Sequence, residues 1–334
     1  MKSWTTGAFA GLMLTTALTA CNSSESTTTA PEAAAPVCDR ACLIKLTDNY
    51  VAALVKHSAD GAHLSNDVTI VENLKHIGTD AGLWKDLTAG PTQFQVHVPD
   101  EANETAGWLG MVERDGKPTM VAIRLKLDPR GSIVEAEHLY AEVGKPQQAN
   151  TQAVRAGLVS EVPPASRKTH DELIRIGASY YDALDDNDGT KMPFAADCER
   201  HENGMITAGP NSGPGPNGPR PHPVARDCAG QLSSGTFQYI ATIGNRRVFA
   251  ADPQTGLVMG LSQFHHPMDF AAYPVKAADG TVTQTRRDEG FFKTMQPFDL
   301  PAAHIFKVGA DGKVHEIEAM GFLAPLNSPS GWDK

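Results

Sequence analysis

The chain has 334 residues, of which 20% are charged, and its formal net charge at pH 7 is -10. This length is enough for two ordinary domains. The excess of acidic residues argues against a surface that binds nucleic acid, because phosphates attract basic side chains. We therefore expect a two-domain globular protein that does not bind nucleic acid.

The N-terminus has the order of a secretory signal over residues 1–21. Lys2 precedes an apolar stretch that ends near Leu18 and is too short and threonine-rich to span a bilayer. Leu18-Thr19-Ala20-Cys21 resembles a bacterial lipobox, which implies that the protein is a lipoprotein whose lipidated N-terminus is Cys21. The alternative is an ordinary signal that ends near a cysteine. Asn22 in place of Asp implies sorting to the outer membrane, facing the periplasm or the cell surface.

Residues 22–37 contain Ser, Thr, Ala, Pro and Glu, with Val37 as the only large apolar residue. Such a segment cannot bury enough surface to repay ordering, so it is predicted to be a flexible tether. We expect a first domain over residues 38–150, a second over 165–325 and a tail over 326–334.

Four cysteines remain besides Cys21, and an even number in an oxidising compartment suggests two disulfides. They are Cys38, Cys42, Cys198 and Cys228. Three pairings are possible, and locality favours Cys38 with Cys42 and Cys198 with Cys228. Because an i,i+4 pair inside a regular helix is too far apart to bridge, Cys38 should lie just before a helix. No further ligand completes a four-ligand metal set.

An internal repeat organises the rest of the chain. Leu43-Ile44-Lys45-Leu46 recurs as Leu173-Ile174-Arg175-Ile176, and Glu72-Asn73 recurs as Glu202-Asn203. Glu135 and Glu137 likewise resemble Glu316 and Glu318, two residues apart in each copy. The second copy is longer, with its extra residues in the Gly/Pro-rich loop 209–223 and in residues 267–301. Insertions of this kind usually lie on a functional rim.

Each copy is predicted to begin with an amphipathic helix, because apolar residues recur there at helical spacing. A short acidic loop that ends in Glu-Asn follows, and then come strands. Strands are predicted at 94–98, 108–113, 120–127 and 132–140 in the first copy, and at 236–243, 246–251, 257–264, 303–308 and 313–320 in the second.

This order resembles the nuclear transport factor 2-like (NTF2-like) or SnoaL-like superfamily. In detail it resembles an uncharacterised family of secreted fungal and bacterial proteins around Cys38 to Leu43, Thr69 to Asn73, Gly82-Leu83-Trp84 and Cys198 to Gly204. The resemblance implies an α+β fold of two cone-shaped domains, each a curved antiparallel sheet wrapped around N-terminal helices. It also implies a blind pocket that is used for proton transfer or for binding alone, so fold does not settle function.

Candidate catalytic residues are concentrated in the second copy, where a histidine near a carboxylate suits general base chemistry. They are Tyr180, Arg200, His201, Glu202, His265 and His266. Alternation along a strand allows only one of His265 and His266 to face the pocket. The alternatives are core tyrosines and histidines that lie on the surface or at the rim.

Candidate ligand-binding residues come from both copies. They are Tyr50, Glu72, Asn73, Trp84, Asn203, Arg246 and Arg247. Because the Glu-Asn pair recurs in both copies, a structural role in a turn is the favoured alternative for it.

No cofactor is expected, since the sequence lacks nucleophile-elbow, phosphate-loop and dinucleotide motifs. A metal site built from His222, His265, His266 and His304 lacks supporting spacing. Two hypotheses remain. One is a cofactor-independent lyase, isomerase or hydratase that acts on a small organic or sugar-derived molecule. The other is a non-catalytic lipoprotein that binds a small ligand or an envelope partner. The membrane contact is expected through the lipid anchor alone.

Overall fold

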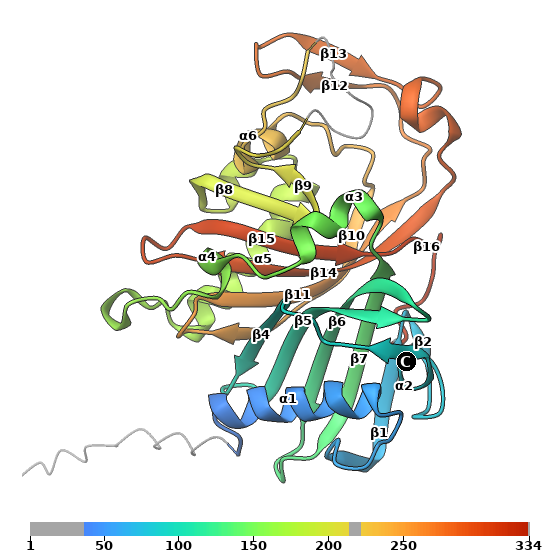
Figure 1. The fold of residues 1–334 in the computed structure, drawn as a ribbon. Coiled ribbons are helices and arrows are strands. Elements are labelled where there is room, and N and C mark those ends of the chain that lie inside the picture. Colours follow the sequence, from blue (N-terminus) through green and yellow to red (C-terminus); the bar gives the residue numbers. More distant parts are fainter. Residues whose placement is uncertain (1–36, 214–221, 333–334) are drawn as a thin grey trace, which may run out of the picture. The chain divides into compact units, whose positions relative to one another are not determined.

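The computed structural model describes residues 37–213 and 222–332. It is an α+β protein with two seven-stranded sheets, both rich in antiparallel strands and curled, and a few helices (Figure 1). The predicted signal, Cys21 and nearly all of the tether lie outside the described residues, as does the middle of the Gly/Pro-rich loop. Within the described ranges, no helix is long and apolar enough to cross a membrane.

The first half consists of one long helix, a short helix and a seven-stranded sheet. The helices are α1 (Arg40–Val55) and α2 (Leu83–Asp86). The strands are β1 (Leu64–Glu72), β2 (Lys75–His76), β3 (Leu87–Ala89), β4 (Gln95–Asp100), β5 (Thr105–Arg114), β6 (Lys117–Leu127) and β7 (Ile133–Glu142). The sheet order is β2-β1-β7-β6-β5-β3, and β4 also pairs with β5.

A connecting segment with four short helices leads into the second half. They are α3 (Lys145–Gln148), η1 (Ala149–Thr151), α4 (Ala156–Val159) and η2 (Pro164–Ser166). The helices of the second half are α5 (His170–Asp185), η3 (Gly189–Lys191), α6 (Cys228–Ser233) and η4 (Gly290–Thr294).

The second sheet has the order β10-β11-β14-β15-β8-β9, with β16 paired to β14, and a separate hairpin pairs β12 with β13. The strands are β8 (Phe194–Glu202), β9 (Met205–Ala208), β10 (Thr242–Asp252), β11 (Leu257–His266), β12 (Tyr273–Lys276), β13 (Val282–Thr285), β14 (Phe298–Val308), β15 (Val314–Gly321) and β16 (Ala324–Pro325).

The two sheets share a pairing pattern that the sequence did not predict. The prediction of an acidic loop after each first helix was wrong, because these segments form the strands β1 and β8. Each pairs in parallel with the last long strand of its half, β1 with β7 and β8 with β15. In matching register, Glu72 lies opposite His138 and Glu202 lies opposite Ala319.

A second correction concerns the strands predicted at 236–243 and 246–251. The structure has one strand there, β10, and residues 236–241 form turns and irregular chain before it. Phe237 and Tyr239 alternate with polar residues as in a strand, but they pack as walls of the cavity described below.

Local sequence explains where both long helices begin. The Asp39 side chain accepts a hydrogen bond from the Cys42 backbone N–H at the start of α1. Thr169 and Glu172 form a reciprocal capping box at the start of α5. The predicted disulfides Cys38–Cys42 and Cys198–Cys228 are both present, and Cys38 lies before the first helical residue as expected.

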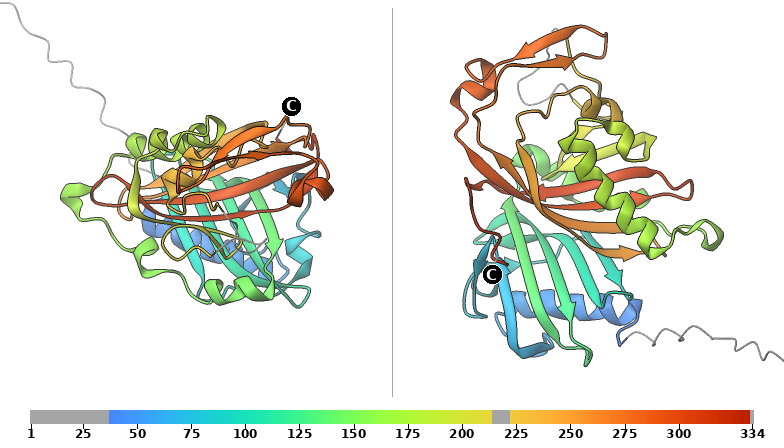
Figure 2. Two further views of the ribbon diagram at one scale, coloured as in Figure 1. Left: turned by 90° about the horizontal axis from the view of Figure 1, so that it is seen from above. Right: turned by 180° about the vertical axis from the view of Figure 1, so that it is seen from behind.

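Three hydrophobic cores hold the described residues together. One lies between α1 and the first sheet, and a second lies between α5 and the second sheet (Figures 1 and 2). The third contains residues of both sheets, such as Leu109 and Met120 from the first and Met259 and Ile305 from the second. The sheets therefore pack against each other through apolar faces, and each helix covers the opposite face of its own sheet.

Candidate functional site

A cavity of about 120 Å³ lies between α5 and the second sheet, and we call it the inner cavity. Its walls come from α5, β8, β11, β14, β15 and residues 237–240. The lining residues are Tyr180, Leu184, Arg200, Glu202, Asn203, Phe237, Tyr239, Ile240, Phe264, His266, Leu300, Ala302, His304, Ala319, Met320 and Gly321. Four of the six predicted catalytic residues line it, together with Asn203 from the predicted ligand-binding set.

Arg200 brings a guanidinium group into this mostly apolar and aromatic space. The residue is only 2% exposed. Its Nε atom lies 3.0 Å from both the Thr207 hydroxyl and a Glu202 carboxylate oxygen, and its Nη2 donates to Gln231. Its Nη1 makes a single long contact of 3.4 Å to the Tyr180 hydroxyl. Nη1 is therefore the part of the group best able to donate to a ligand.

Two histidines face the cavity in the neutral form at pH 7. Burial lowers the pKa of His304 to about 3, and the nearby Arg200 charge lowers it further. The Nδ1 atom of His304 is buried without a hydrogen-bond partner among the described residues. Burial also lowers the pKa of His266 to about 4. Its Nδ1 lies 3.2 Å from the Phe264 carbonyl oxygen, and its ring stacks on Phe298.

The tyrosines of the cavity are protonated at pH 7. Burial raises the pKa of both Tyr180 and Tyr239. Tyr180 packs against the His304 ring with 5.1 Å between centroids. The ionisable and hydroxyl groups in the cavity therefore include the Arg200 cation, the hydroxyl groups of two tyrosines and two neutral imidazoles. The Glu202 carboxylate lies at the edge of the cavity, and its side chain is 44% exposed.

Sequence reasoning did not select Tyr239 or Phe237, and it considered His304 only as a metal ligand. His304 stands alone in an apolar strand and matches no motif. Phe237 and Tyr239 fall within the strand predicted at 236–243, and their alternation with polar residues does not indicate which space they line. The fold brings Tyr180 of α5, His304 of β14 and residues 237–240 together around one cavity.

The recurring asparagines have a structural role in the same place of each half. Asn73 and Asn203 have positive φ angles of 41° and 47° at the turns after β1 and β8. Each side chain both donates to and accepts from the backbone of the last long strand, at Tyr140 and Gly321 respectively. These contacts match the structural alternative for the asparagine of each Glu-Asn pair, whereas Glu202 lines the cavity.

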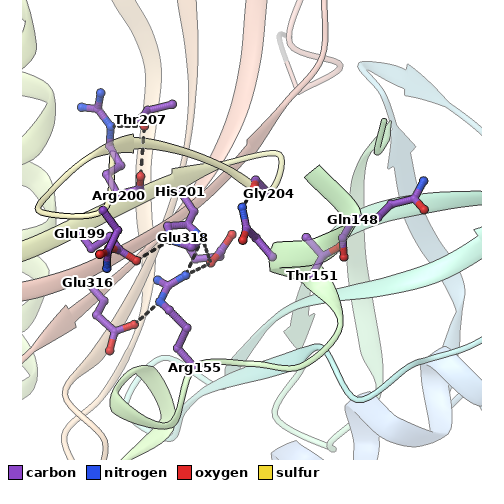
Figure 3. Close-up of polar contacts among 12 residues, drawn as sticks. Gln148, Thr151, Arg155, Glu199, Arg200, His201, Gly204, Thr207, Glu316 and Glu318 are labelled. Carbon is purple, nitrogen blue, oxygen red and sulfur yellow. Dashed lines mark hydrogen bonds and ion pairs between the residues drawn. The ribbon is translucent and has the colours of Figure 1, made fainter. Parts of the chain in front are cut away.

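His201 lies away from the inner cavity, because side chains alternate along β8 and Arg200 takes the inward position. Its Nε2 lies 2.7 Å from Glu199 and its Nδ1 lies 2.8 Å from Arg155 Nη1 (Figure 3). Burial and the Arg155 charge lower the pKa of His201, so the neutral ring donates to Glu199 and accepts from Arg155. Arg155 also pairs with Glu316 and Glu318, so this cluster ties the connecting segment to the second sheet.

Three more predicted residues also lie outside the cavity lining. His265 points to the opposite face from His266, as alternation predicted, and bonds Asp299 at 2.7 Å. Arg246 pairs with acidic residues at the end of α5. Arg247 reaches across to Glu137 of the first sheet. Ion pairs with nearby carboxylates hold the side chains of Arg246 and Arg247 in place.

The corresponding region of the first half is occupied by side chains. The Tyr50 hydroxyl lies 2.8 Å from His138 Nε2, and His138 Nδ1 lies 3.0 Å from Glu72. Trp84, which is 1% exposed, packs edge-on against Tyr50 with 5.3 Å between centroids. His138 stands at the position of Ala319, where the small side chain leaves space in the second half. These first-half candidates form a buried network rather than the wall of a cavity.

No group of three or more His, Cys, Asp or Glu side chains within residues 37–213 and 222–332 is arranged to hold a metal ion.

The fold and the site define an α+β protein with a small, partly polar cavity in its second half. A family model described as a domain of unknown function (DUF8021) matches residues 166–321. No curated protein matches the chain. A solved NTF2-like protein of unknown function from Cytophaga hutchinsonii ATCC 33406 is 15% identical, with a TM-score of 0.24 over 30% of this chain and 89% of its own.

Proposed function

We propose that this protein is a ligand-binding protein whose inner cavity holds one small organic ring through an oxygen atom that faces Arg200. The observation that carries this proposal is a guanidinium group, 2% exposed, in a cavity walled mainly by aromatic and aliphatic side chains. Nε and Nη2 of Arg200 already have partners, whereas Nη1 has only the long contact to Tyr180, so Nη1 is suited to donate to an oxyanion or carbonyl group of a ligand.

The size of the cavity limits the ligand. A cavity of roughly 150 Å³ accommodates benzene, and the inner cavity measures about 120 Å³. The aromatic rings of Phe237, Tyr239 and Phe264 offer stacking and edge contacts to a planar molecule. A ring with one carboxylate or carbonyl substituent suits the polarity of the cavity, and the volume of about 120 Å³ excludes anything larger than a single small ring.

Binding is favoured over chemistry because the cavity histidines are weak bases. General base catalysis works best when the pKa of the base lies near the operating pH. Burial holds the pKa of His304 at about 3 and that of His266 at about 4, which is far below neutrality. Neither ring is therefore tuned to remove a proton from a ligand at pH 7.

One observation favours the enzyme hypothesis as a second candidate. The Glu202 carboxylate lies at the cavity edge, 3.0 Å from Arg200, while Arg200 and Tyr180 can donate to an oxyanion. A carboxylate base beside groups that can donate to an oxyanion suits a cofactor-independent lyase, isomerase or hydratase. Untargeted mass spectrometry of a metabolite extract incubated with the protein separates the two functions, since only an enzyme converts a depleted compound into a mass-related product.

Calorimetric titration of the purified protein with benzoate tests the binding proposal. We expect saturable binding that weakens about 10- to 100-fold in Arg200→Met, because a hydrogen bond to a charged group is lost. Arg175→Met removes an exposed arginine from the outer side of α5 and is the matched control. Circular dichroism checks that both variants fold. Absence of binding of benzoate, benzaldehyde and cyclohexanecarboxylate to the wild-type protein would overturn the proposal.

The finer description of the fold is also a proposal. A leading helix across a curled sheet, with the same strand order in both halves, supports a tandem pair of NTF2-like cones. The recurrence of the asparagine contacts at Asn73 and Asn203 supports duplication of one ancestral domain.

The lipobox-like sequence before Cys21 supports attachment to the cell envelope. Metabolic labelling of a bacterial expression host with an alkynyl fatty acid is expected to tag the wild-type protein and to leave Cys21→Ser untagged. Equal labelling of both proteins, or of neither, would contradict the lipid anchor.

A further inference from the structure

A second and larger cavity, of about 630 Å³, lies on the surface of the second half beside the inner cavity. We call it the outer groove. Its walls come from the end of α5, from the chain around Ser233 to Gln238, and from the hairpin β12–β13. Ile240 lines both the groove and the inner cavity, and Leu184 of the cavity adjoins Asp185 of the groove. The two spaces therefore adjoin at Ile240 and at the end of α5.

We infer that the outer groove binds a saccharide, the hydroxylated part of a ligand whose ring occupies the inner cavity. This inference rests on the proposed binding function and names its ligand class as an aryl glycoside or similar sugar conjugate. The walls of the groove support a saccharide through their rigidity, their charge and their mixed polar and apolar surface.

Hydrogen bonds fix the hairpin wall against the opposite wall. Gln238 Nε2 donates to the Pro274 carbonyl oxygen at 3.2 Å, and the Lys276 backbone N–H donates to Ser234 at 2.9 Å. In the first half, the strands β5 and β6 that correspond to β11 and β14 are joined by a tight turn at Asp115 and Gly116. The hairpin is thus an addition of the second half that encloses the groove.

The acidic residues of the groove do not call for a cationic ligand. Asp185 pairs with Arg246, and Asp186 pairs with Lys191. Their remaining oxygen lone pairs can accept from hydroxyl groups. The exposed Lys276 ammonium has no ion-pair or hydrogen-bond partner among the described residues and can donate. The groove thus combines hydrogen-bond acceptors on paired carboxylates with one unpaired ammonium donor, and such interleaved donors and acceptors suit the hydroxyl groups of a polyol.

Apolar side chains complete the match to a sugar. Ile240, Pro274 and the 59% exposed Val282 supply flat aliphatic surface between the polar groups. A pyranose ring has C–H faces that need such surface and a rim of hydroxyls that need polar partners. The groove volume lies within the roughly 300–1,000 Å³ of ordinary ligand sites, whereas the inner cavity alone is smaller.

The test compares benzoate with its 4-glycosides, which are the 4-carboxyphenyl derivatives of glucose, galactose and N-acetylglucosamine. Calorimetric titration of the full-length protein is expected to show at least one glycoside binding ten-fold or more tightly than benzoate. In Lys276→Glu this ratio should fall to about one. Lys293→Glu changes an exposed lysine of the same insertion that does not line the groove, and it should keep the wild-type ratio.

The outcomes separate this inference from the proposed function. If benzoate binds and all three glycosides bind no more tightly, the saccharide subsite is wrong while the inner cavity keeps its function. If no benzoate binds but a glycoside does, and Lys276→Glu abolishes that binding, the groove holds sugar and the inner cavity proposal fails. Loss of the ratio in Lys293→Glu as well would also overturn the assignment to the groove.

Discussion

Replacing Glu137 with alanine is expected to lower the free energy of unfolding by about 3 kcal/mol, because it breaks a buried ion-pair network between the sheets. Glu137 is 1% exposed. Its carboxylate accepts hydrogen bonds from the guanidinium groups of Arg247 on β10, at 2.8 Å, and of Arg124 on β6, at 3.3 Å. Without this carboxylate, Arg247 has no acidic partner among the residues that the structure describes, and Arg124 keeps only Glu135 as an acidic partner there. Urea denaturation followed by circular dichroism measures the change.

The same sequence motif supplies the control. Glu135 stands two residues away, is 40% exposed at its side chain and, within residues 37–213 and 222–332, pairs only with Arg124. Glu135→Ala should therefore cost less than about 1 kcal/mol, as exposed ion pairs do. Equal losses in Glu135→Ala and Glu137→Ala would show that the link between the sheets contributes nothing beyond a surface charge pair.

The sequence predicted the parts of the fold that depend on local pattern. Both long helices were expected from apolar residues at helical spacing, and most strands of the two antiparallel meanders from alternation. The strand β1 was missed because its first half is polar, with Asn66 and Asp67 exposed, and β8 was missed because charged residues fill its second half, at Glu199 to Glu202. Their pairing partners, β7 and β15, lie far along the chain, so no local signal reports the parallel pairing.

The candidate site was predicted in part for the same reason. Arg200, Glu202 and Tyr180 were selected as reactive residue types, and the fold brings them to one cavity. Whether a residue on β8 faces inward depends on strand register, which local composition did not indicate. His201 and Arg200 therefore could not be separated until β8 was placed beside β15.

A comparison of the halves explains why only one of them offers this cavity. Both begin with a helix that carries a buried tyrosine, Tyr50 or Tyr180, facing the sheet. In the first half His138 bonds that tyrosine, and Trp84 packs against it. In the second half Ala319 takes the place of His138, and the cavity adjoins Tyr180. In the first half, side chains thus fill the space beside the tyrosine that remains open in the second half.

Replacing His304 with phenylalanine is expected to make the protein more resistant to acid. The folded state holds the pKa of His304 at about 3, below its ordinary value of 6.5, because burial disfavours the imidazolium. As the pH falls below 6.5, His304 takes up a proton in the unfolded chain but stays neutral in the folded protein, so the free energy of unfolding decreases. Between pH 7 and pH 4.5 this linkage amounts to about 2 to 3 kcal/mol.

His304→Phe removes this contribution and keeps an aromatic ring that can stack on Phe306 as the imidazole does, at 5.9 Å and an interplanar angle of 5°. It also removes a buried Nδ1 that has no partner among the described residues. The measurement is the urea midpoint of wild-type and variant protein at pH 7 and pH 4.5, with the exposed His76→Phe as control. The control should lose stability in acid as the wild type does. An equal loss in His304→Phe would mean that His304 is protonated in the folded protein, and that the inner cavity tolerates a second cation beside Arg200.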